Sequence, residues 1–121
     1  MSYVVAGHYR KTPNETVDLG IGFGALLASG EALTGTPTVS IGPGGGNAPH
    51  LQKASVQINT TAAFTDKDGA NSIAQNEGVI ATYSGGVDGQ TYTVTAQATN
   101  DTTSEVHEVV IHVTIDSGVV R

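Results

Sequence analysis

The stretch that decides the fold is TYTVTAQAT, residues 91–99. Every second side chain in it is apolar, and these side chains share one face: Tyr92, Val94, Ala96 and Ala98. Threonine and glutamine occupy the other face. Alternation with a period of two is typical of a β-strand with one buried face. We therefore expect a half-buried strand here, with the core on the side of Tyr92.

The segment that follows repeats this pattern. Residues 100–104 are polar turn formers without an apolar side chain. In residues 105–115, aliphatic side chains again fall at every second position: Val109, Ile111, Val113 and Ile115. Two such segments joined by a polar turn predict a β-hairpin.

The rest of the chain contains further short segments of strand composition: residues 3–9, 16–21, 37–41, 54–59 and 78–84. The apolar run at residues 23–30 has helical spacing but is short, so we expect a single turn that ends at Gly30. Residues 60–76 are polar and turn-rich, and we expect an extended surface loop there. About seven short strands with frequent turns predict an all-β, immunoglobulin-like Greek-key β-sandwich, with a small β-barrel as the second possibility.

The length of 121 residues is sufficient for one domain with one core. We expect a single immunoglobulin-like domain over residues 1–121, with an N-terminal arm at residues 1–12 and a C-terminal arm at residues 116–121. Tryptophan is absent and aromatic residues make up 5% of the sequence, so the core must consist mainly of small aliphatic side chains. Such a core buries little area per side chain, and we expect neighbours in an assembly to add stability.

The formal net charge is −6, and the sequence holds only five lysines and arginines. Binding to nucleic acid or to an anionic membrane surface requires clustered cations, so we expect neither. Cysteine is absent, which excludes disulfides and zinc–thiolate sites. The first residues do not have the pattern of a signal peptide, and no apolar run is long enough for a membrane helix. We expect folding in a reducing cytoplasm.

Motifs for catalysis or cofactor binding are incomplete. Residues 20–24, GIGFG, have the third glycine one place too early for a dinucleotide site and lack the βαβ unit. Residues 66–69, DKDG, resemble the start of a calcium loop, but most later ligand positions do not match. His107 and His112 are an odd number of residues apart, which places them on opposite faces of a strand. Since a Gly-x-Ser-x-Gly motif is also missing, we expect no enzyme activity, no cofactor and no metal site.

Tyr92 stands two residues before the core position Val94, in the sequence DGQTYTV. This arrangement resembles the tyrosine corner of immunoglobulin-like sandwiches, in which the tyrosine hydroxyl bonds to nearby backbone. The role implied for Tyr92 is structural.

Three segments in the same order resemble short immunoglobulin-like virion proteins of tailed bacteriophages. They are KTPNETVDL at residues 11–19, LLASGEAL at residues 26–33 and SGGVDGQTYTV at residues 84–94. This chain has Phe23 in the first turn, where members of the group often carry tryptophan, and its central part, residues 42–76, is longer and richer in glycine.

That group includes head decoration proteins and fiber–tail adaptor proteins. The resemblance therefore implies a non-catalytic structural protein of the virion, present in many copies and made in the host bacterial cytoplasm. It would be a capsid decoration or cement protein, or a neck or tail adaptor. Its partners would be major capsid or neck and tail proteins, together with further copies of itself.

Partner contacts are expected at the two termini, in the glycine-rich loop and in the 60–76 segment. Terminal strands can extend a neighbour's sheet, and glycine allows close approach of a partner's backbone. The residues expected at these contacts are Tyr3, Tyr9, Gly44, Gly45, Gly46, Phe64, Val119 and Val120. The alternative is a carbohydrate- or host-surface-binding module, which would present an exposed aromatic platform such as Tyr83.

Overall fold

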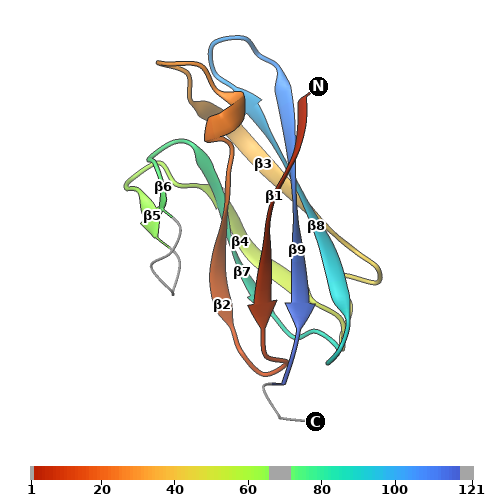
Figure 1. Ribbon diagram of the computed structural model, residues 1–121. Coiled ribbons are helices and arrows are strands. Elements are labelled where there is room, and N and C mark those ends of the chain that lie inside the picture. Colours follow the sequence, from red (N-terminus) through yellow and green to blue (C-terminus); the bar gives the residue numbers. More distant parts are fainter. Residues whose placement is uncertain (1, 66–71, 118–121) are drawn as a thin grey trace.

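The computed structural model describes residues 2–65 and 72–117. In that part of the chain it is all-β, with nine strands and one 3₁₀ turn, η1 (Gly24–Leu26). Two main sheets pack against each other, and a short hairpin lies beside the smaller one (Figure 1). The all-β prediction is therefore confirmed.

The larger sheet has four strands, in the order β1 (Ser2–Lys11), β9 (Val106–Ile115), β8 (Thr91–Asn100) and β3 (Leu33–Gly42). Strands β8 and β9 form the expected antiparallel hairpin, with Tyr92 opposite Val113 and Val94 opposite Ile111. All four of these side chains are fully buried. The alternation in the sequence thus correctly identified the central hairpin and its core face.

Strand β1 pairs with β9 in parallel, so the first and last strands lie side by side and run in the same direction (Figure 1). The register places His8 opposite His112. An ion pair between Arg10 and Asp116 joins the ends of the two strands. Most of the segment that we expected as an N-terminal arm, residues 1–12, is therefore hydrogen-bonded into the sheet.

The smaller sheet has three strands, in the order β2 (Val17–Gly22), β7 (Gly78–Ser84) and β4 (Gln52–Ile58). Strand β7 is central and pairs antiparallel with both neighbours. The buried residues of this sheet that join the core are mostly aliphatic, with one tyrosine: Val17, Leu19, Ile21, Ile58, Val79, Ala81 and Tyr83. The core between the sheets therefore consists mainly of small side chains, as the composition predicts.

Residues 60–76 contain a hairpin of two short strands, β5 (Phe64–Thr65) and β6 (Ser72–Ile73). The prediction of an extended loop was wrong in this respect. A buried side chain, Asn59, closes the base of the hairpin: its Nδ2 donates to the carbonyl oxygens of Ile73 and Ala74, at 3.3 and 2.9 Å. Its Oδ1 accepts from the Gly78 N–H at 3.0 Å.

Two boundaries also differ from expectation. Strand β3 begins at Leu33, four residues before the expected 37–41 segment. A register shift around Gly35 (φ +76°) interrupts its alternation, and for this reason the first part of the strand was not predicted. The helical turn is limited to η1, and Gly30, at φ +85°, lies after it in a separate turn.

Candidate interaction surface

The glycine-rich loop between β3 and β4 holds three of the expected contact residues. Gly44 and Gly46 have φ values of +72° and +91°, which side chains rarely adopt. A Cβ on Gly45 would lie 2.5 Å from the Ile41 carbonyl oxygen. The Gly46 N–H donates to the Leu51 carbonyl at 2.9 Å, which closes the loop. The glycines are therefore required by the fold of the loop itself.

Tyr92 anchors the same end of the molecule. Its hydroxyl accepts from the Val87 N–H at 3.1 Å, which confirms the expected bond to nearby backbone. The hydroxyl also lies 2.9 Å from Nδ1 of His50, at the end of the glycine-rich loop. The Gly86 N–H donates to the Pro49 carbonyl at 3.0 Å. The loops before β4 and before β8 are thus fixed to each other around one buried tyrosine.

Phe64 and Tyr9, two more of the expected contact residues, both adjoin Gly20. The hairpin β5–β6 lies on the outer face of the smaller sheet, where a Cβ on Gly20 would meet Phe64 Cδ2 and Ile73 Cδ1, both at 2.7 Å. The Tyr9 hydroxyl donates to the Gly20 carbonyl at 3.4 Å. Gly20 belongs to the GIGFG segment, so this glycine serves close packing of chain segments.

The remaining expected residues are less fully described. Tyr3 belongs to strand β1, opposite Glu108. Val119 and Val120, like the DKDG segment at residues 66–69, lie outside the described residues.

The opposite end of the sandwich contains a polar network. The Asn100 Nδ2 donates to Glu31 Oε1 at 2.8 Å and lies 3.4 Å from Nε2 of His107. The Ala28 N–H also donates to Glu31 Oε1, at 2.8 Å. These two bonds, led by the one from Ala28, hold the pKa of the Glu31 carboxyl below its usual value of 4.5. His107 is 3% exposed, so this histidine is part of the buried end of the sandwich.

Two aromatic side chains that a sugar platform would need are in the core. Tyr83 and Phe23 are both fully buried. Burial raises the pKa of the Tyr83 hydroxyl, and among the described residues this hydroxyl has no hydrogen-bond partner. The idea of an exposed platform at Tyr83 is therefore wrong.

Two open grooves lie beside strand β4. One, of about 300 Å³, runs between the smaller sheet and the 60–64 segment and is lined in part by Asp18, Gln57 and Phe64. The other, of about 370 Å³, lies between β3 and β4 and is lined in part by Pro37 and Val56. Their linings mix polar and apolar side chains without a catalytic constellation.

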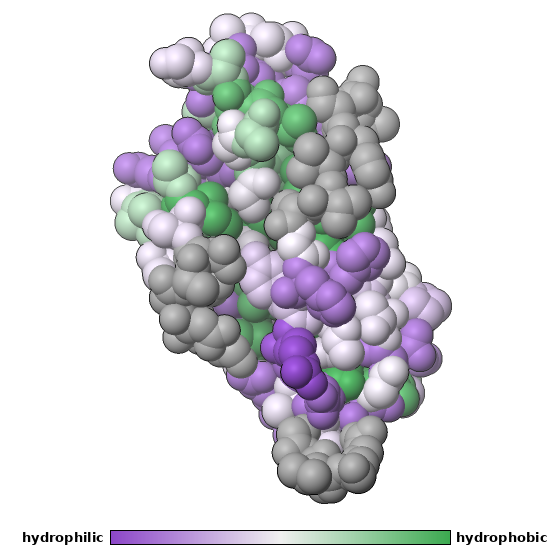
Figure 2. All heavy atoms as spheres, viewed as in Figure 1, coloured by the Kyte–Doolittle hydropathy of each residue, from purple (hydrophilic) through white to green (hydrophobic). Residues whose placement is uncertain are grey.

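The face seen in Figure 2 is divided by polarity. Hydrophobic side chains gather in its upper part, around η1, where Leu26 and Leu27 are half-buried. Hydrophilic side chains form a group in the lower part, over β1 and β9, with paler and a few hydrophobic side chains beside it. In the described part of the chain no helix could cross a membrane.

A comparison with protein-family models gives one match, over residues 11–114, to the family described as "Podophage GP4 fiber-tail adaptor protein gp77". The match covers most of the chain. The chain belongs to the podophage fiber-tail adaptor protein family. No curated protein and no solved structure matched.

Members of this family are structural tail adaptors of the virion, which implies a non-enzymatic component of the phage tail. The resemblance to tailed-phage virion proteins is therefore confirmed.

Within this adaptor, the expected contact residues fall into separate groups. Tyr9 and Phe64 lie near Gly20, whereas the loop of Gly44–Gly46 lies at the Tyr92 end.

Proposed function

We propose that this chain is the adaptor through which a podophage tail holds its fiber, and that it acts through protein–protein contacts alone. The family match over residues 11–114 carries the proposal. The same match favours the tail over the head, where a capsid decoration or cement protein would bind. The partners are then a tail protein on one side, a fiber protein on the other and further copies of the adaptor.

The sandwich is, in this proposal, a single immunoglobulin-like domain. If β2, β3, β4, β7, β8 and β9 are equated with strands B to G, one sheet contains B, E and D and the other contains C, F and G, which supports this proposal. Strand β1 departs from the constant-type arrangement, because it pairs with β9 and not with β2. The bond from the Val87 N–H to Tyr92, near the start of β8, supports a tyrosine corner at the usual place.

Contacts to the tail and fiber are assigned to the termini and to two surface segments. Strand β1 is an edge strand of the larger sheet, and an edge offers unpaired backbone groups to a partner strand. The glycine-rich loop connects the two sheets, and the hairpin at Phe64 lies on the outer face of the smaller sheet. Tyr3, Tyr9, Gly44, Gly45, Gly46, Phe64, Val119 and Val120 are the proposed contact residues.

A carbohydrate-binding module on the same fold is the alternative. Its support is weaker, because Tyr83 and Phe23 are fully buried and Tyr9 is half-buried against the core. Phe64, beside Asp18 and Gln57 in the groove of about 300 Å³, is the remaining described aromatic with a polar surrounding.

Depletion and add-back test the proposal. Particles assembled without this chain are expected to keep filled heads and tails but to lack fibers, and adding the purified protein together with purified fiber is expected to restore them. Particles that keep their fibers but lose head stability would instead favour a decoration protein.

The contact residues are tested in the same add-back assay. Val119→Asp combined with Val120→Asp, and separately Tyr3→Ala, are expected to reduce fiber attachment. Ala54→Asp is the control, because Ala54 is an exposed residue of β4 in the smaller sheet, away from the paired strands β1 and β9. Equal loss in the control would remove the assignment of these contacts.

A further inference from the structure

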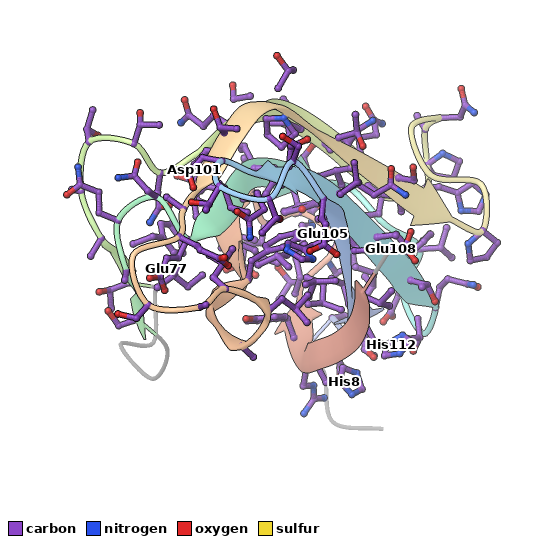
Figure 3. All side chains as sticks on the ribbon, turned by 90° about the horizontal axis from the view of Figure 1, so that it is seen from above. His8, Glu77, Asp101, Glu105, Glu108 and His112 are labelled. Atoms are coloured by element: carbon purple, nitrogen blue, oxygen red, sulfur yellow. The ribbon has the colours of Figure 1, made fainter. Side chains whose placement is uncertain are left out.

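Two histidines that are far apart in the sequence lie next to each other on the larger sheet. His8 of β1 pairs directly with His112 of β9, and their ring centres are 6.3 Å apart at an interplanar angle of 73°. Figure 3 shows both side chains on the outer side of the sheet, away from the core. With metal–nitrogen bonds of about 2.0–2.1 Å, two imidazoles on one ion place their ring centres roughly 5–6 Å apart. The observed separation of the rings is slightly longer than this, so binding of one ion requires rotation of at least one ring.

A threonine hydroxyl lies within hydrogen-bonding distance of one ring nitrogen of each histidine. The His8 Nε2 lies 2.6 Å from Thr114 Oγ1, which in turn lies 3.0 Å from Thr91 Oγ1. The His112 Nδ1 lies 3.5 Å from Thr93 Oγ1. A metal-bound histidine usually donates its second ring N–H to such an oxygen, which fixes the tautomer and the ring plane. This leaves Nδ1 of His8 and Nε2 of His112 as the two nitrogens available for a ligand.

We propose that His8 and His112 are two ligands of a site for a divalent transition-metal ion, with Zn²⁺ as the reference ion. Imidazole nitrogen suits Zn²⁺, Ni²⁺ and Cu²⁺, whereas Mg²⁺ and Ca²⁺ prefer oxygen. The described residues contain no group of three or more metal-binding side chains. Water or a carboxylate of a neighbouring molecule completes the coordination in this proposal.

The charges around the pair are compatible with a cation. Arg10, the next outward-facing residue of β1, forms an ion pair with Asp116. The net charge of the chain is −6, which raises the local concentration of cations. Nothing in the family description concerns metal binding, so this inference is independent of the proposed function.

Zinc binding to the tag-free protein tests the site by isothermal titration calorimetry. We expect saturable binding of one Zn²⁺ per chain. His8→Ala and His112→Ala are each expected to abolish it. Thr114→Val is expected to weaken it by about tenfold, because Thr114 only orients His8. Glu108→Gln, on the same outer face of β9, is the control and should bind like wild type.

Histidine nitrogen spectra give a second readout. In two-dimensional nitrogen–proton NMR, Zn²⁺ is expected to shift Nδ1 of His8 and Nε2 of His112 and to leave His50 and His107 unchanged. Lack of saturable binding below about 1 mM Zn²⁺ would overturn the proposal. Binding that persists in the variant with both histidines replaced would place the ion on the acidic surface and would overturn it as well.

Discussion

Phe64 packs directly on Gly20: a Cβ built on Gly20 would come within 2.7 Å of Phe64 Cδ2. The absence of a side chain at this position of β2 is what allows the β5–β6 hairpin to lie on the outer face of the smaller sheet. The GIGFG segment, which superficially suggests nucleotide binding, is thus explained in part by packing within the adaptor.

Gly20→Ala is therefore expected to displace the hairpin and to lower the free energy of unfolding by about 1–3 kcal/mol, as overpacking does. Urea unfolding measures the loss, and limited proteolysis should show faster cleavage between residues 60 and 77. Gly22→Ala is the control, because its Cβ would meet Ile73 Cγ1 at an ordinary 3.6 Å. Equal effects of the two substitutions would contradict this account of Gly20.

Two buried tyrosines should respond oppositely to loss of the hydroxyl. Tyr92→Phe removes the bonds to the Val87 N–H and to His50, and it should cost about 1–3 kcal/mol because two part-buried hydrogen bonds are lost. Tyr83→Phe removes a buried hydroxyl that has no partner in the described residues, and it should be neutral or stabilising. Thermal or urea unfolding of the two variants checks this. A larger loss of stability for Tyr83→Phe than for Tyr92→Phe would contradict the conclusion that the Tyr92 hydroxyl is the one that stabilises the fold.

Asn59 should be required for the base of the hairpin. Asn59→Ala removes the acceptor of the buried Gly78 N–H and the side-chain donor to the Ile73 and Ala74 carbonyls, and we expect a loss of about 2 kcal/mol. The Ala74 carbonyl keeps its bond from the Glu77 N–H. Amide hydrogen exchange at Gly78 should accelerate. Gln75→Ala removes only an exposed bond to the Thr60 carbonyl and should change stability by no more than about 0.5 kcal/mol. Unchanged hydrogen exchange at Gly78 in the Asn59 variant would count against a role for the Asn59 side chain in closing the base of the hairpin.

Glu31 should make stability depend on pH. Its pKa is lowered in the folded state by bonds from Ala28 and Asn100, so the unfolded chain binds more protons as pH falls below 4.5. The stabilisation that the ionised Glu31 carboxylate gives to the folded state is then present at neutral pH, and it is lost as pH falls through the lowered folded pKa. Glu31→Gln is expected to be less stable than wild type at about pH 7, with a difference that shrinks towards about pH 3. A difference that stays constant over this range would show that ionisation of Glu31 plays no part.

The central hairpin was predictable because its two strands are neighbours in the sequence and alternate strictly. Tyr92 and Val113 are buried opposite each other for that reason. Interruptions of the alternation hid other features. The bulge at Gly35 concealed the first half of β3, and the polar sequence around residues 60–76 concealed β5 and β6, whose packing depends on Gly20.

Pairs made by distant segments were not predictable. Comparing histidines by spacing pointed to His107 and His112, which lie on opposite faces, with His107 buried. The neighbour of His112 is His8, and this follows only from the parallel pairing of the first and last strands. Tyr83 was misjudged similarly, because its burial depends on the packing of one sheet on the other.

The most direct test of the adaptor function is a cryo-electron microscopy map of intact particles, with this domain fitted as a rigid body. We expect density for the sandwich between the tail and the base of each fiber, with strand β1 or the loop of Gly44–Gly46 in contact with a partner. Density for the domain on the capsid surface, with none at the tail–fiber junction, would contradict the account.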